Sequence, residues 1–177
     1  LTAASPGATG PVLGLSDGRV VEESLEVMQW ALVQSDPLGW LEGNALDSDW
    51  ISECDSDFKH WLDRYKYAER YPEHTADQYR NNAEVFIQKL EDRLSVSDWM
   101  GGEAAHAVDV ALFPFIRQFA GVDPSWWQSA PYPSVRRWLE NWLNSALFSA
   151  IMAKYPRWES GRAGERFPPD PEHDALK

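Results

Sequence analysis

The chain has 177 residues, 44% of them hydrophobic and 25% charged, which is the composition of a globular protein with room for one domain and part of another. Its formal charge of -12 argues against nucleic acid as a partner, because binding to a phosphate backbone depends on Lys and Arg. No run approaches the roughly 18 apolar residues of a membrane span and no signal-peptide pattern opens the sequence, so we expect a cytoplasmic protein that does not bind membranes.

The first forty residues predict a loop, a short hairpin and a helix. Residues 1–10 are rich in small residues, Gly and Pro, as loops are. An apolar run, residues 12–15, and a second run with two β-branched residues, residues 19–21, flank an Asp-Gly turn, which is the pattern of a β-hairpin. Ser24 can cap a helix whose apolar residues then recur every three or four positions. A hairpin and one helix cannot cover both faces of a sheet, so we expect further sequence before Leu1.

From about residue 48 onward the sequence predicts helices almost throughout. Two consecutive stripes of apolar residues at spacings of three and four predict two long amphipathic helices, and their short connection predicts an antiparallel pair. The first stripe consists of Ile51, Cys54, Phe58, Trp61, Leu62 and Tyr65. The second consists of Tyr79, Ala83, Phe86, Ile87, Leu90 and Leu94.

The second half of the helical region has a segment that is apolar on every side. Residues 108–119 therefore predict a buried central helix, and Pro114 within it predicts a kink. A further apolar stripe over residues 135–143 and a short apolar run over residues 147–152 predict two more helices. After Trp158 the composition is that of a polar tail.

Three separated segments carry a family resemblance. They are Thr9–Leu13 with the following Asp17-Gly18 and Glu23-Ser24, then Leu62–Tyr67, and then Val108–Phe119. In this order and spacing they resemble the cis-proline strand and Glu-Ser pair, the first helix and the buried central helix of the glutathione S-transferase family. The resemblance covers most of the chain.

The resemblance implies a mainly α fold, a glutathione-transferase C-terminal-like helical bundle preceded by a β-hairpin and helix remnant of a thioredoxin-like domain. Residues 1–35 would be the C-terminal part of the truncated thioredoxin-like, glutathione-binding domain. Residues 44–158 would form the all-helical C-terminal domain, and residues 159–177 a polar tail. The family's catalytic Tyr, Ser or Cys would precede Leu1, so we assign no catalytic residue in this chain.

Glu23 and Ser24 are the first candidate binding residues. A helix start offers free N–H groups and a partial positive charge to a carboxylate, and Ser24 adds a hydroxyl. Glu23 suits an ammonium group, so the pair suits a zwitterion such as the γ-glutamyl end of glutathione. The alternative is that Ser24 only caps the helix and Glu23 only complements its dipole. The resemblance also assigns Gly10 and Pro11 to glutathione binding, with Pro11 in the cis form, although members usually carry a larger residue at Gly10.

Other residues receive structural or secondary roles. Asp109 lies in an apolar run and is interpreted as structural, near the start of the central helix. Cys54 is expected to be a buried core thiol with nothing basic beside it. The resemblance implies that Trp61, Tyr65 and Tyr67 border the electrophile pocket, although they equally suit the core. The His and Cys spacing predicts no metal site.

The resemblance implies a homodimeric protein that binds glutathione as a substrate and a small hydrophobic electrophile. When complete, it would conjugate the two or use glutathione as a reductant. The main alternative is a transferase-like scaffold or dimerisation module without activity. A member of the related two-domain glutaredoxins is a third possibility, and it would need a Cys-rich motif upstream.

Overall fold

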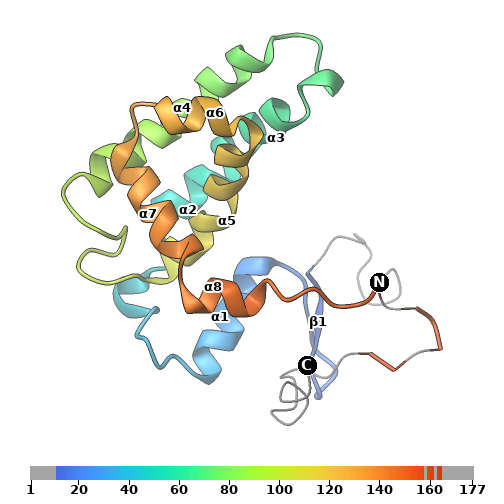
Figure 1. Cartoon of the computed structure of the whole chain (residues 1–177). Coiled ribbons are helices and arrows are strands. Elements are labelled where there is room, and N and C mark those ends of the chain that lie inside the picture. The colour runs from blue at the N-terminus through green and yellow to red at the C-terminus, as the bar shows by residue number, and fades with distance from the viewer. Residues whose placement is uncertain (1–10, 158, 162, 165–177) are drawn as a thin grey trace. The chain divides into compact units, whose positions relative to one another are not determined.

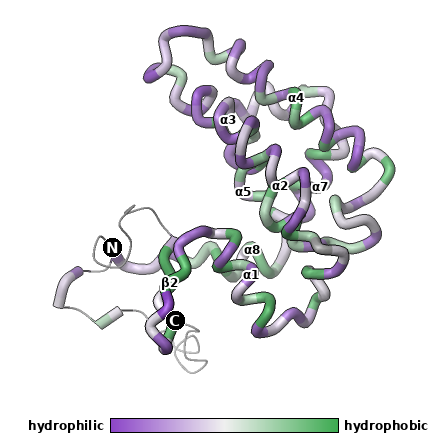
Figure 2. The backbone as a smooth tube through the Cα atoms, turned by 180° about the vertical axis from the view of Figure 1, so that it is seen from behind, coloured by the Kyte–Doolittle hydropathy of each residue, from purple (hydrophilic) through white to green (hydrophobic). Residues whose placement is uncertain are grey.

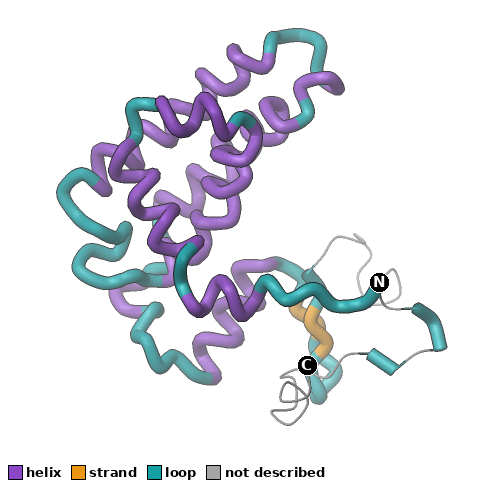
Figure 3. Tube along the Cα trace, in the orientation of Figure 1, coloured by secondary structure: helices purple, strands orange, loops and turns teal. Residues whose placement is uncertain are grey.

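The computed structural model describes residues 11–157, 159–161 and 163–164. Helices dominate this part of the chain, which has one two-stranded sheet near its beginning (Figures 1 and 3). The predicted mainly α fold with a leading hairpin and helix is therefore confirmed. Contacts divide the chain between Trp142 and Leu143 into two units, which are described separately. In the described ranges, no helix is both long and apolar enough to cross a bilayer.

The first unit begins with the predicted hairpin. Strand β1 (Leu13–Gly14) pairs antiparallel with β2 (Val20–Val21), so that the first residue of β1 lies opposite the last of β2. The Asp17 carboxylate accepts a hydrogen bond from the backbone N–H of Arg19 at 3.0 Å. Gly18 has a φ of 88°, a left-handed conformation that costs glycine little because it has no Cβ. The Asp-Gly sequence therefore closes the turn as expected.

Helix α1 (Ser24–Gln34) follows the hairpin. The expectation that Ser24 caps this helix is wrong, because Glu23 holds the N-cap position and Ser24 is the first helical residue. The carbonyl of Glu23 already accepts the first helical hydrogen bond, from Val27 N–H at 2.9 Å. None of the residues of α1 is buried.

The linker after α1 is fixed to the helical region by its backbone. Asp36 accepts hydrogen bonds from the N–H groups of Trp40 and Leu41, both at 2.9 Å. The Trp40 carbonyl then accepts from Ala107 N–H at 2.9 Å, and its ring meets Trp142 edge-on at 6.3 Å. These contacts hold the end of α1 near the start of the central helix. A 3-10 turn, η1 (Glu42–Asn44), completes the linker.

The first long amphipathic helix is interrupted by a π-helical turn. Helix α2 (Asp49–Glu53) leads into η2 (Cys54–Phe58) and then α3 (Lys59–Lys66). The N–H of Lys59 donates to the carbonyl of Cys54, five residues back. Apolar spacing predicted the helix but not this turn. The buried side chains are nevertheless the predicted ones, namely Ile51, Cys54, Phe58, Leu62 and Tyr65, with Trp61 half-buried.

The second long helix packs against the first. After the 3-10 turn η3 (Ala68–Arg70) the chain turns back into α4 (Ala76–Leu94), which lies against α3 (Figure 1). Thr75 and Gln78 form a reciprocal capping box at its start, with distances of 3.2 and 2.9 Å. Hydrophobic and hydrophilic residues alternate along these helices (Figure 2). The buried residues on their apolar sides belong to the core.

Helix α5 (Ala107–Val122) is the predicted central helix, and it runs through Pro114. It contacts α2, α3 and α6 (Pro124–Ser129). Asp109 near its start is fully buried, and its carboxylate accepts four hydrogen bonds. The donors are Met100 N–H at 2.7 Å, Gly101 N–H at 3.1 Å, His106 N–H at 3.0 Å and Trp138 Nε1 at 2.8 Å. Asp109 is therefore a structural residue, as interpreted from the sequence.

Helix α7 (Pro133–Leu143) starts on a carboxylate from another helix. Buried Glu91 of α4 accepts two hydrogen bonds from Ser134 N–H at 3.0 Å and one from Val135 N–H at 2.9 Å. The acidic group satisfies the free N–H groups at this helix start and complements its dipole. Nothing in the local sequence around residue 133 predicts this cap.

The second unit contains α8 (Ala146–Ile151), which corresponds to the predicted short apolar helix. The Ser145 hydroxyl caps it by accepting from Phe148 N–H at 3.1 Å. Most of the predicted polar tail, residues 159–177, lies outside the described residues. The domain limits proposed from the sequence remain a prediction.

Candidate functional site

The N-terminal end of α1, called here the tip of α1, has hydrogen-bonding groups without a partner among the described residues. Glu23 and Ser24 are both exposed there. The N–H groups of a helix's first turn have no acceptor within the helix and carry a partial positive charge. Within the described part of the chain, the Ser24 hydroxyl has no hydrogen-bond partner, and no side chain caps the helix. The tip therefore offers donors for an anionic group beside the carboxylate of Glu23.

The two other residues assigned to glutathione binding lie before the hairpin. Gly10 lies outside the described residues. Pro11 is exposed and stands two residues before β1, and its cis form stays a prediction. The chain between Pro11 and Ser24 is the hairpin itself.

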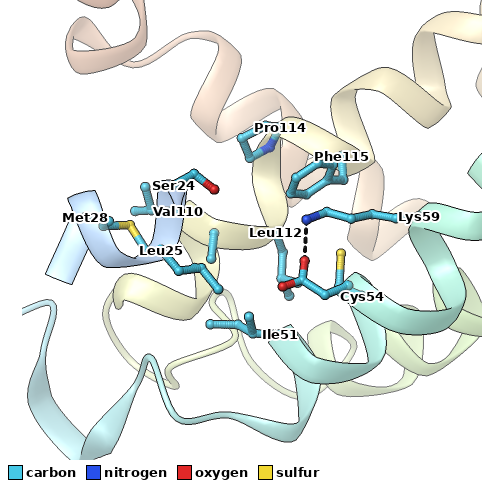
Figure 4. A pocket seen from close by; sticks show the side chains of 12 residues that line it. Ser24, Leu25, Met28, Ile51, Cys54, Lys59, Val110, Leu112, Pro114 and Phe115 are labelled. Atoms are coloured by element: carbon cyan, nitrogen blue, oxygen red, sulfur yellow. Dashed lines mark hydrogen bonds and ion pairs between the residues drawn. The ribbon is translucent and has the colours of Figure 1, made fainter. Parts of the chain in front are cut away.

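A cavity of about 280 Å³ opens beside Ser24 (Figure 4). It lies between α1, the α2–η2–α3 run and α5, so residues far apart in the sequence share its wall. Most of the lining side chains are apolar, as in typical small-molecule sites. The lining residues are Ser24, Leu25, Met28, Ile51, Cys54, Asp55, Lys59, Val110, Ala111, Leu112, Pro114 and Phe115.

An ion pair forms the charged part of this wall. Lys59 Nζ bonds Asp55 Oδ1 across one turn and lies 3.9 Å from the centre of the Phe115 ring, a cation–π contact (Figure 4). The π-helical turn η2 contains Asp55 and precedes Lys59, so it helps to place both on the cavity wall. Sequence reasoning missed this site because an Asp-Lys pair four residues apart is typical of any exposed helix.

Cys54 is a buried thiol rather than a nucleophile. Its side chain is 1% exposed, and burial raises the pKa of the thiol to about 12. The expectation that nothing basic adjoins Cys54 is wrong, because Lys59 lies close enough to lower this pKa, but burial has the larger effect. Cys54 is therefore protonated near neutral pH. Among the described residues, no group of three or more His, Cys, Asp or Glu side chains is placed to hold a metal ion.

The three aromatic residues assigned to the electrophile pocket have different surroundings. Trp61 lines a separate cavity of about 170 Å³ between α3 and α4. Tyr65 is buried with its ring 5.5 Å from Phe119, and burial raises the pKa of its hydroxyl. The ring of Tyr67 faces the Arg70 guanidinium at 4.4 Å. None of the three lines the cavity beside Ser24.

Comparisons with known proteins agree on one family. Residues 59–141 match the family of the glutathione S-transferase C-terminal domain. By sequence, no curated protein matches the chain. Among solved structures, a glutathione transferase of Phanerochaete chrysosporium in complex with oxidized glutathione is similar with a TM-score of 0.71 and 16% identity, over 85% of this chain and 74% of that one.

Two bacterial structures are similar as well. The ternary complex of BphK, a bacterial glutathione S-transferase, has a TM-score of 0.70 and 16% identity, covering 84% of this chain and 75% of that one. A glutathione transferase of Burkholderia graminis, with two glutathione molecules bound per subunit, has a TM-score of 0.66 and 17% identity, covering 84% and 68%. At these identities the likeness shows a shared fold.

Proposed function

We propose that the chain is a member of the glutathione S-transferase family, and that it binds glutathione at the tip of α1 and a second, apolar substrate in the adjacent cavity. In the complete protein this pairing would serve conjugation of glutathione to an electrophile, or reduction by glutathione. We include in the proposal that residues 1–35 belong to the glutathione-binding domain and residues 44–158 to the helical domain. The homodimer and the cytoplasmic location implied by the resemblance also belong to it.

The open tip of α1 beside an apolar cavity is the observation that carries this proposal. The γ-glutamyl end of glutathione bears a carboxylate and an ammonium group. The free N–H groups and the Ser24 hydroxyl suit the carboxylate, and the exposed Glu23 carboxylate suits the ammonium group. Gly10 and Pro11 would hold the cysteinyl part, as the resemblance implies.

For the second substrate we propose the cavity beside Ser24 rather than the surroundings of Trp61, Tyr65 and Tyr67. The cavity includes Ser24, the proposed partner of the γ-glutamyl carboxylate, in its wall, so a molecule bound there would lie beside glutathione. Tyr65 is in the core, and Trp61 opens into another cavity. The lining of Leu25, Met28 and Phe115 suits an apolar molecule.

Binding of the complete protein to immobilised glutathione tests the proposal. We expect Ser24→Ala and Glu23→Gln each to weaken binding about tenfold, the effect of losing one hydrogen bond to a charged group. The matched controls are Ser16→Ala in the exposed hairpin turn and Glu22→Gln one residue before the pair, and both should bind like the unaltered chain.

Two outcomes would contradict the proposal. If the complete protein without substitutions passes through the glutathione matrix, the scaffold alternative is favoured. If it is retained but Ser24→Ala and Glu23→Gln are retained equally well, glutathione binds elsewhere on the molecule.

A further inference from the structure

The Lys59 ammonium group is a hydrogen-bond donor on the wall of the cavity. Its side chain is 34% exposed and belongs to the first residue of α3. One neighbour is the carboxylate of Asp55 and the other is the face of the Phe115 ring. In Figure 4 the ammonium group of Lys59 lies beside the Phe115 ring, and the dashed line marks its ion pair with Asp55.

Lys59 keeps unused donors while its charge is compensated. An ammonium group has three N–H bonds, and the described residues accept only one of them, at Asp55 Oδ1. The Asp55 carboxylate also offsets the positive charge, so an anionic ligand placed here would meet a negative neighbour. The rest of the wall is mostly apolar and would strip water from a charged ligand at a high cost. A neutral hydrogen-bond acceptor avoids both penalties.

We propose that Lys59 is a specificity-determining residue that donates a hydrogen bond to an uncharged acceptor, such as a carbonyl oxygen, on an otherwise apolar ligand. The volume of about 280 Å³ has room for a single aromatic ring with a short substituent. This inference rests on the proposed function in calling the ligand a substrate. Ligand binding in the cavity itself does not require glutathione, so the two can fail independently.

Methyl NMR of the full chain with labelled methionines measures such binding directly. The chain has 3 methionines: Met28 lines this cavity, Met100 lines a different one, and Met152 belongs to the second unit. Acetophenone, isopropylbenzene and benzoate are suitable probes, because they share one ring and a similarly shaped substituent. The substituent is a neutral acceptor in the first, apolar in the second and anionic in the third. Titration of the Met28 methyl shift, with Met100 as the internal reference, gives the three dissociation constants.

The variant Lys59→Leu separates a binding role from a structural one. We expect it to weaken acetophenone binding about tenfold, the loss of one hydrogen bond from a charged donor, and to leave isopropylbenzene binding unchanged or tighter. Lys89→Leu is the matched control, because Lys89 pairs with Glu53 at 2.6 Å on the surface and does not line this cavity. It should bind all three probes like the unaltered chain. Asp55→Asn should strengthen benzoate binding several-fold because it removes the repelling charge.

Three results would overturn the proposal. The first is a Met28 signal that none of the probes moves, which would mean that the cavity takes no such ligand. The second is an equal loss of acetophenone and isopropylbenzene in Lys59→Leu, which would mean that Lys59 only shapes the wall. The third is unchanged acetophenone binding in that variant. If the protein does not bind immobilised glutathione but the probes bind as expected at Met28, the proposed function is wrong and the role of Lys59 in the cavity still holds.

Discussion

Two helix starts in this molecule are built in opposite ways. At the start of α5 the buried carboxylate of Asp109 accepts the His106 N–H and three further hydrogen bonds. At the start of α1 no side chain caps the helix, and Ser24 is exposed. Helix α5 buries eight residues and α1 buries none. The start of α5 therefore contributes to the stability of the first unit, while the start of α1 keeps hydrogen-bonding groups free for a ligand.

The largest expected effect on stability comes from removing the Asp109 carboxylate at the start of α5. Asp109→Ala leaves the backbone donors of Met100 and Gly101 and the Trp138 indole N–H without an acceptor in the core. We expect a loss of at least about 3 kcal/mol in the free energy of unfolding, because several buried donors lose their partner together. Urea unfolding followed by tryptophan fluorescence measures it.

Asp109→Asn serves as the control, since it keeps the shape and one acceptor oxygen. Asp109→Asn should lower the free energy of unfolding less than Asp109→Ala does. If both variants unfold like the original chain, stability is not concentrated at this helix start and the comparison fails.

A smaller effect is expected at alkaline pH from Cys54. In the folded protein the pKa of this thiol is raised to about 12 from its ordinary value of 9.0. Between these values the unfolded chain has released the proton and the folded protein has kept it, so the unfolded state gains stability as pH rises. Between pH 8 and pH 10 we expect the free energy of unfolding to fall by about 1 kcal/mol more in the unaltered chain than in Cys54→Ala.

Urea unfolding of both proteins across this pH range provides the measurement. Tyr65, Tyr79 and Tyr132 also have raised pKa values and contribute with the same sign, but they are present in both proteins and cancel in the difference. Parallel pH profiles would show that the Cys54 thiol is not shielded as its burial indicates.

The smallest expected effect on stability is at the tip of α1. Ser24→Ala removes no hydrogen bond among the described residues, so the free energy of unfolding should change by less than about 0.5 kcal/mol. Ser48→Ala is the matched control, because the Ser48 hydroxyl caps α2 by accepting from Trp50 N–H at 3.3 Å. That variant should lose about 1 kcal/mol, the usual cost of removing a cap. A loss for Ser24→Ala as large as for Ser48→Ala would show that the start of α1 is not free of stabilising contacts.

Much of the fold was predictable because local patterns repeat. The Asp-Gly turn predicted the hairpin, and apolar spacing predicted the two long helices and the central helix. The N-cap at α1 was predicted one residue too late, since a serine before an apolar stripe resembles a cap whether or not its hydroxyl is used. The π-helical turn was missed because the same apolar residues face the core with or without it.

The sequence alone determined most of the helices, the hairpin and the buried stripes, because these depend on residues that are near one another along the chain. Only the tertiary structure decided which distant residues meet. It placed Glu91 at the start of α7 and brought Asp109 to Trp138. It also formed one cavity whose wall combines residues of α1, the α2–η2–α3 run and α5. The reason is physical: the hydrogen-bond donors of a buried carboxylate come from other elements, and local sequence does not show which distant donors reach it.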